Sequence, residues 1–144
     1  MLAAKGVIGT LLAFSESAIV LLLIKGFGPS PGIVLVSIFL GAVMVTGVAM
    51  ISGSAGKDLV ATMLLSMIFL IPLCIPAFSV LFPGSAAPWI RVLPSYGLVQ
   101  AIVGANFYGY GWTDSARYLV TPALWCVAFA AIGILVLRRR VRTL

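Results

Sequence analysis

The sequence predicts an all-α, polytopic membrane protein: a bundle of four transmembrane helices, with short re-entrant or interfacial helices before the last span. Three counts point to this class. The chain has 144 residues, 62% of them are hydrophobic, and only 8% are charged. A soluble domain has about 25% charged residues. This chain therefore has too few charges to cover a globule of its size with polar surface, and we expect it to lie in a bilayer.

The same counts exclude most catalytic and metal-binding chemistry. The chain has no histidine and three acidic residues, so the usual general bases and metal ligands are scarce. Cys74 and Cys126 lie in separate apolar runs without CxxC spacing, which is typical of buried thiols. Four of the nine basic residues fall within 138–142, a juxtamembrane cluster that favours anionic lipid over nucleic acid. We expect no catalytic residue, metal, cofactor or nucleic-acid partner for this chain.

Four apolar stretches are long enough to cross the membrane. A hydrocarbon core of about 30 Å takes roughly 20 helical residues. The chain is therefore expected to be one transmembrane domain, residues 1–144, ending in a basic tail at 138–144. The predicted spans are 6–24, 32–52, 59–82 and 118–137.

The segment 83–117 is too polar and too interrupted to be a fifth span. Within it, 88–93 and 95–103 are predicted as short apolar helices, each beginning at or just after a proline. Its aromatic residues are typical of a membrane interface. We favour short helices that dip into the bilayer and return, since irregular backbone at depth must be covered by protein or water. A solvated loop is the alternative.

Basic residues predict the orientation. An even number of spans puts both termini on one side, together with Lys5, Lys57 and the four arginines of 138–142. Lys25, Arg91 and Arg117 fall on the other side. Six against three predicts that both termini are cytoplasmic and that 83–117 is extracellular.

A cleaved signal peptide is the alternative for the first span. Lys5, an apolar run and Ser15-Glu16-Ser17 resemble such a peptide with a small-residue cleavage site. However, the apolar run resumes at once over 18–24, so cleavage would leave a hydrophobic stub. We therefore interpret the run as a span.

Glu16 lies near the middle of the first predicted span. An acid there costs about 2.5–3.5 kcal/mol on insertion scales, so we expect it to face protein or water. It shares helical spacing with Gly9, Ala13 and Val20, a stripe where another helix can approach. Two readings stay open: a contact in a substrate or proton path, or a hydrogen-bonded carboxyl that holds two helices together.

Pro72 and Pro76 lie four residues apart in the third predicted span. Each removes a backbone donor and crowds the preceding turn, so the helix is expected to kink. The kink is either a hinge beside a transport path or a static bend.

No phosphate-binding loop is predicted. Gly56-Lys57 stands in the turn after the second span, but Walker A needs two glycines at fixed spacing and Ser or Thr after the lysine. Asp58 follows here, so the motif is rejected.

The order of these features resembles the C-terminal part of a bacterial ABC-2 type permease. The resemblance rests on Lys5 opening a span, the 52–58 turn, Pro83-Gly84, Pro88-Trp89-Ile90, Leu93-Pro94-Ser95-Tyr96, and a last helix that ends in Leu137-Arg138-Arg139-Arg140. The proline, tryptophan and tyrosine run is similar to the family's "P-x-W…L-P-x-Y" stretch, which precedes the last span. The resemblance implies a transmembrane subunit that works as a dimer with two cytoplasmic ATPase subunits and moves lipids, polysaccharides, drugs or peptides.

The chain departs from that family by having four spans where the family has six. It is therefore expected to be a fragment or the C-terminal part of a permease, without the first two spans and the coupling helix. The resemblance implies a multi-pass protein of the bacterial plasma membrane that is not itself an enzyme, with ATP bound by the partner subunit.

The alternative function is a small four-helix membrane protein with a scaffolding or accessory role, and a membrane enzyme ranks third. The residues predicted for the transport path or for helix packing are Glu16, Pro72, Pro76, Trp89, Pro94 and Tyr96.

Overall fold

The computed structural model describes residues 2–56, 58–82 and 87–142. Lys57 and the Pro83-Gly84 pair of the sequence motif lie outside these described residues. The elements in order are α1 (Leu2–Leu23), α2 (Pro31–Ala55), α3 (Leu59–Leu81), the 3₁₀ helix η1 (Pro88–Val92), α4 (Tyr96–Phe107) and α5 (Trp112–Arg142).

The predicted all-α bundle with four spans is confirmed. Helices α1, α2, α3 and α5 are each long and apolar enough to cross a membrane. Three of them extend beyond the predicted spans, most of all α5, which starts at Trp112 rather than Tyr118 and continues through Arg142. Hydropathy marks only the part of a helix inside the hydrocarbon core, whereas the backbone can stay helical into the headgroup region.

Local sequence signals explain two helix starts. Pro31 occupies the first turn of α2, where its missing N–H has no helical partner to lose. Asp58 caps α3, because its Oδ1 accepts a 2.7 Å hydrogen bond from the backbone N–H of Ala61. This cap gives Asp58 a structural role at a helix end.

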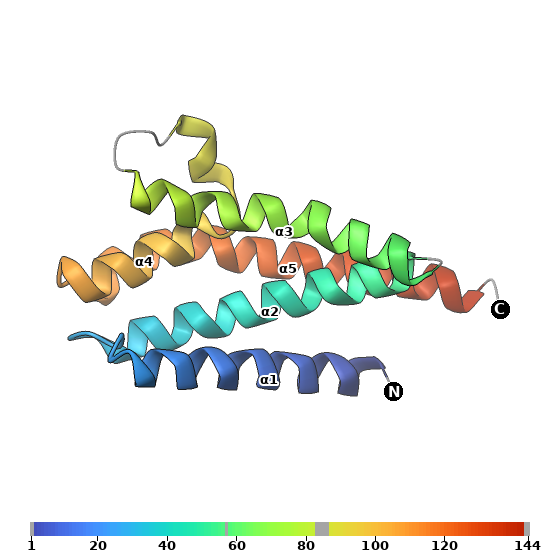
Figure 1. The fold of residues 1–144 in the computed structure, drawn as a ribbon, viewed down its shortest axis with the longest axis horizontal. Coiled ribbons are helices and arrows are strands. Elements are labelled where there is room, and N and C mark those ends of the chain that lie inside the picture. Colours follow the sequence, from blue (N-terminus) through green and yellow to red (C-terminus); the bar gives the residue numbers. More distant parts are fainter. Residues whose placement is uncertain (1, 57, 83–86, 143–144) are drawn as a thin grey trace.

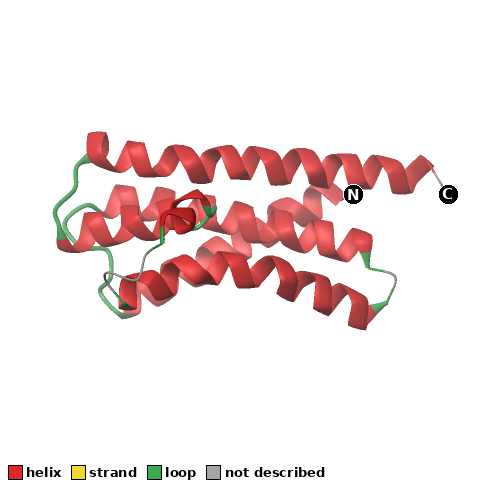
Figure 2. Cartoon of the chain, turned by 90° about the horizontal axis from the view of Figure 1, so that it is seen from above, coloured by secondary structure: helices red, strands yellow, loops and turns green. Residues whose placement is uncertain are grey.

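The four long helices run along one direction, and the N- and C-termini lie at the same end of the molecule (Figure 1). We call this end, which also holds the α2–α3 turn, the terminal end. The C-terminal ends of α1, α3 and α4 lie at the opposite end, which we call the aromatic end. Figure 2 shows the long α5 running along the bundle to the C-terminus.

Helix α2 is the centre of the bundle. It packs on α1, α3, α4 and α5, and 44% of its span is buried, whereas no residue of the α1 span is buried. Two apolar clusters surround α2. One contains Met44, Val48, Ile51, Leu98, Cys126 and Phe129, and the other contains Ile33, Val34, Ile38, Ala101 and Ala105.

The short helices before α5 form a re-entrant hairpin. The chain leaves α3 at the aromatic end and lays η1 beside α3, and α4 then starts within the length of the bundle and returns to that end (Figure 1). With 12 residues, α4 is about 18 Å long, roughly half of a bilayer crossing. The prediction of re-entrant helices is thus confirmed over the described residues 87–107, and α4 ends at Phe107 rather than Val103.

Candidate functional site

Two hydrogen bonds hold the turn of the re-entrant hairpin inside the bundle. The hydroxyl of Ser95 donates to the backbone carbonyl of Leu73 at 2.6 Å. The indole Nε1 of Trp125 donates to the carbonyl of Val92 at 3.2 Å. Leu73 lies eight residues inside the end of α3, a depth of about 12 Å at 1.5 Å per residue. Irregular backbone at this depth is therefore tied to both neighbouring spans, as a bilayer requires.

Close backbone packing holds α4 against α5. A Cβ at Gly97 would lie 2.7 Å from Cδ of Pro122 and would collide with the carbonyl oxygen of Tyr118. Only a glycine allows this approach without displacing the helix. Both Gly97 and Pro122 are buried, so the first turn of α4 is locked onto α5 by shape.

The other end of α4 is joined to the α1–α2 loop. The Nδ2 of Asn106 donates to the carbonyl of Gly26 at 2.9 Å. The Oδ1 of the same side chain is buried and has no hydrogen-bond partner. Gly28 adopts φ of 54° next to Asn106, a left-handed conformation that favours glycine. Asn106 thus connects the hairpin to the element that leads from α1 into α2.

Glu16 lines an open groove between α1, α2 and α4. The groove has a volume of about 650 Å³. The Glu16 side chain is exposed, and none of the described side chains forms an ion pair with it. It lies seven residues before the end of α1, about 10 Å from that end. The groove lining is Ala13, Glu16, Ser17, Val20, Leu21, Ser37, Ile38, Gly41, Ala42, Val45, Leu98 and Ile102.

Glu16 is the only polar side chain in this lining besides two serines, whose hydroxyls are already used. Ser17 donates to Ala13 at 2.8 Å, and Ser37 donates to Ile33 at 2.8 Å, each within its own helix. The groove therefore combines apolar walls with one carboxyl whose hydrogen-bonding capacity is free for a ligand or a partner helix.

The structure brings some of the predicted site residues together and leaves others apart. Pro72 and Pro76 flank Leu73, and the carbonyl of Leu73 meets the hairpin between Pro94 and Tyr96. Pro76 and Pro94 are buried. The predicted proline segment and the predicted hairpin motif therefore form one contact.

Glu16 and Trp89 do not share this contact. Glu16 faces the separate groove described above. Trp89 is 57% exposed on η1, so it projects away from the core of the bundle. Whether α3 moves about its prolines stays a prediction; the helix continues through both of them as a single element.

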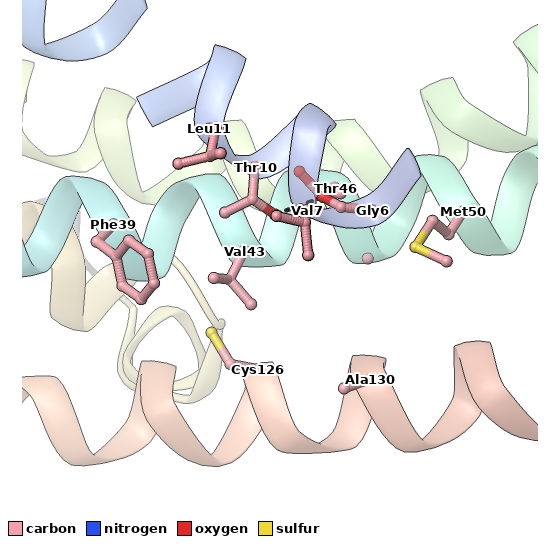
Figure 3. Close-up of a pocket in the computed structure, with 11 residues that line it drawn as sticks. Gly6, Val7, Thr10, Leu11, Phe39, Val43, Thr46, Met50, Cys126 and Ala130 are labelled. Atoms are coloured by element: carbon pink, nitrogen blue, oxygen red, sulfur yellow. Dashed lines mark hydrogen bonds between the residues drawn. The ribbon is translucent and has the colours of Figure 1, made fainter. Parts of the chain in front are cut away.

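A second groove lies beside the N-terminal half of α1. It has a volume of about 410 Å³, with α1 and α5 as its walls and α2 as its floor (Figure 3). We call it the α1–α5 trough. Its lining is Gly6, Val7, Thr10, Leu11, Phe39, Val43, Thr46, Gly47, Met50, Cys126 and Ala130.

The aromatic residues gather at the end that carries the hairpin loops. The rings of Tyr110 and Tyr118 are stacked with centroids 6.2 Å apart, and Tyr108 lies 5.9 Å from Tyr110. Trp112 is 59% exposed. Amphipathic rings at one end of a bundle are typical of a membrane–water interface.

Sequence reasoning missed the residues that anchor the hairpin. Ser95 was part of a recognised motif, but its long-range partner Leu73 carries no side-chain signal. Asn106 and Trp125 bond to the backbone carbonyls of Gly26 and Val92, and such carbonyls carry no side-chain signal either. The available signal was the Gly97 and Gly104 pair in a short apolar helix, since glycines inside a helix indicate close approach of another element.

No family model, curated protein or solved structure matches this chain. The class of protein is therefore defined by its own fold: a membrane-embedded helical bundle of four candidate spans with a re-entrant hairpin. Among the described residues, no group of three or more His, Cys, Asp or Glu side chains could hold a metal ion.

Proposed function

We propose that this chain is the membrane-spanning permease subunit, or the C-terminal part of one, of an ATP-driven ABC-type exporter. Its substrate would be lipid-like, drug-like or a polysaccharide. In this proposal the protein lies in a bacterial plasma membrane with both termini in the cytoplasm. A cytoplasmic ABC ATPase subunit binds and hydrolyses ATP, and a second permease subunit completes the translocation path.

The observation that carries the proposal is the Glu16 groove with the re-entrant helix α4 as one wall. Its volume of about 650 Å³ falls within the 300–1,000 Å³ range of small-ligand sites. Short helices that start at mid-membrane commonly border the substrate sites of transporters. An apolar groove with one carboxyl suits an amphiphilic substrate that presents a hydrogen-bond donor or a positive charge.

In this proposal α3 and α4 move together as one wall of the groove. The hydrogen bond from Ser95 to Leu73 joins α3 to the start of α4, and Leu98, Ala101 and Ala105 pack α4 into the two apolar clusters. Pro72 and Pro76 both remove helical hydrogen bonds from α3 beside the first of these contacts. ATP binding in the partner would rock α3 and α4 together and change access to the groove.

Substitution of Glu16 by Gln tests the role of the groove. The change keeps the shape and removes the charge. In vesicles that contain the complete permease with this chain in it, together with the ATPase subunit, we expect E16Q to lower ATP-dependent transport of a lipophilic cationic dye while the complex still assembles. D114N is the matched control, since Asp114 is an exposed acid in the first turn of α5 and lies outside the groove. Unchanged transport by E16Q would contradict the proposal.

One observation favours the alternative of a scaffolding or accessory protein. No residue of the α1 span is buried, and the Glu16 carboxyl on that helix lacks a partner among the described residues. A helix with these properties suits a contact with another membrane protein. Under this alternative, E16Q would abolish assembly with a partner. The wild-type chain itself would show no transport activity.

A further inference from the structure

We propose that the α1–α5 trough binds one acyl chain of an anionic phospholipid from the leaflet at the terminal end. The headgroup would lie beside the basic residues of that end. The lipid would be a bound structural component of the protein, beside residues 6–11 of α1, whereas the Glu16 groove lies beside residues 13–21.

The shape of the trough fits a single chain. Both α1 and α5 pack on α2, and the trough separates them (Figure 3). Along α2 it extends from Met50 to Phe39, about 16 Å at 1.5 Å per residue. This length is roughly half of the 30 Å hydrocarbon core, which is the depth of one leaflet.

The chemistry of the lining fits an acyl chain rather than a polar ligand. The two hydroxyl-bearing residues are Thr10 and Thr46, and the Thr10 hydroxyl is used in a 3.0 Å hydrogen bond to Gly6. The thiol of Cys126 donates to the carbonyl of Leu40 at 3.4 Å. The remaining lining is apolar, and Val7 and Leu11 are each 58% exposed, so the trough is open to lipid along the α1 wall.

The charge at the terminal end selects an anionic headgroup. Lys5 precedes Gly6, the first trough residue, and Arg138, Arg139, Arg140 and Arg142 lie in the last turns of α5. Both helix ends lie at the terminal end of the molecule (Figure 1). Of the three acidic residues of the chain, Asp58 lies at this end, where its carboxylate caps α3; Glu16 and Asp114 lie elsewhere. Each basic residue near an anionic membrane surface contributes about 1 kcal/mol of attraction, so five of them give a strong preference for a negative headgroup.

Native mass spectrometry of the full chain in detergent tests the proposal, with 1-palmitoyl-2-oleoyl phosphatidylglycerol and the matching phosphatidylcholine as probes. We expect one phosphatidylglycerol per chain to bind at least about tenfold more tightly than phosphatidylcholine, since 1.4 kcal/mol of charge attraction already gives this factor. Replacing the three arginines of 138–140 with Gln should remove the preference. Equal binding of both lipids by the wild-type chain would overturn the proposal.

Two matched pairs locate the chain in the trough. A130F fills the trough from α5, whereas A131F places the same ring on an exposed neighbour outside it. V7W fills the trough from α1, and I8W is its control, since Val7 and Ile8 are 58% and 57% exposed. We expect A130F and V7W to weaken phosphatidylglycerol binding about tenfold or more, because each displaces the acyl chain and the loss of roughly two buried methylene groups already gives this factor. The controls A131F and I8W should leave the binding unchanged. If members of a pair behave alike, or if A130F instead converts a dimer to a monomer, the trough is not a lipid site.

Discussion

The hydroxyl of Ser95 donates a 2.6 Å hydrogen bond to the backbone carbonyl of Leu73, which lies in α3 between Pro72 and Pro76. Because Pro76 has no N–H, the carbonyl of Pro72 has no donor within the helix. The carbonyl of the next residue, Leu73, accepts the hydrogen bond from the Ser95 hydroxyl. The turn of the re-entrant hairpin thus meets α3 where proline has weakened the helix. This contact joins two sequence features that are 22 residues apart.

Replacing Ser95 with Ala should loosen the hairpin. The change removes the bond to Leu73 and leaves α4 itself intact. We expect a loss of about 1 kcal/mol in the free energy of unfolding, the usual value of such a bond, measured by SDS titration in mixed micelles. S79A is the control, because the Ser79 hydroxyl bonds to Pro76 within α3 itself. An equal loss in both variants would contradict a tethering role for Ser95.

Replacing Trp125 with Phe should free the other side of the hairpin turn. Phe keeps an aromatic ring for Phe129, whose centroid lies 5.6 Å from that of Trp125, but it cannot donate to the carbonyl of Val92. We expect faster hydrogen exchange of the backbone amides of Val92, Leu93 and Ser95, with little change in α5. Unaltered exchange of these amides would show that the 3.2 Å bond from Trp125 does not hold the turn.

Replacing Asn106 with Ala should separate α4 from the α1–α2 loop. The variant removes the donor to Gly26 and, with it, the buried Oδ1 that has no partner. Because these two effects oppose each other, we expect a net loss of about 1 kcal/mol or less. Hydrogen exchange should rise in the loop 24–30. Q100A provides the comparison on the same helix, and a similar rise there would argue against a specific contact.

Replacing Gly97 with Ala should be strongly destabilising. The added Cβ meets the Tyr118 carbonyl, which is backbone, and the Pro122 ring, which is closed onto its own backbone nitrogen, so neither can move aside. Overpacking of this kind costs about 1–3 kcal/mol. Gly53 is helical with nothing within 4 Å of an added Cβ, so G53A should instead gain up to about 1 kcal/mol. Unfolding in mixed micelles should place the two variants on opposite sides of wild type.

The fold class was predictable because apolar runs and their length report directly on membrane spans. The re-entrant path was predictable because prolines and glycines interrupt the segment 83–117, and the structure confirms it. The true start of α5 at Trp112 was not predictable from hydropathy, since Asp114 and Arg117 lie in its first turns and mark the edge of the apolar core rather than the end of the helix.

The candidate site was only partly predictable. Glu16 was singled out because an acid within an apolar span is costly, but its groove depends on α4, which meets α1 and α2 only after folding. The Leu73 carbonyl and the close approach at Gly97 are backbone features, and single-sequence patterns do not reveal such partners. The α1–α5 trough likewise arises from two helices that lie far apart in the sequence.

ATP-driven transport is the most direct test of the proposed function. Inside-out vesicles would carry the complete permease that contains this chain, with its ATPase subunit or with an ATPase variant that binds ATP without hydrolysing it. Uptake of a short-chain fluorescent lipid would be followed with and without ATP. The account predicts uptake only when the chain, an active ATPase and ATP are all present. Normal uptake with the inactive ATPase, or in vesicles that lack the ATPase subunit, would contradict it.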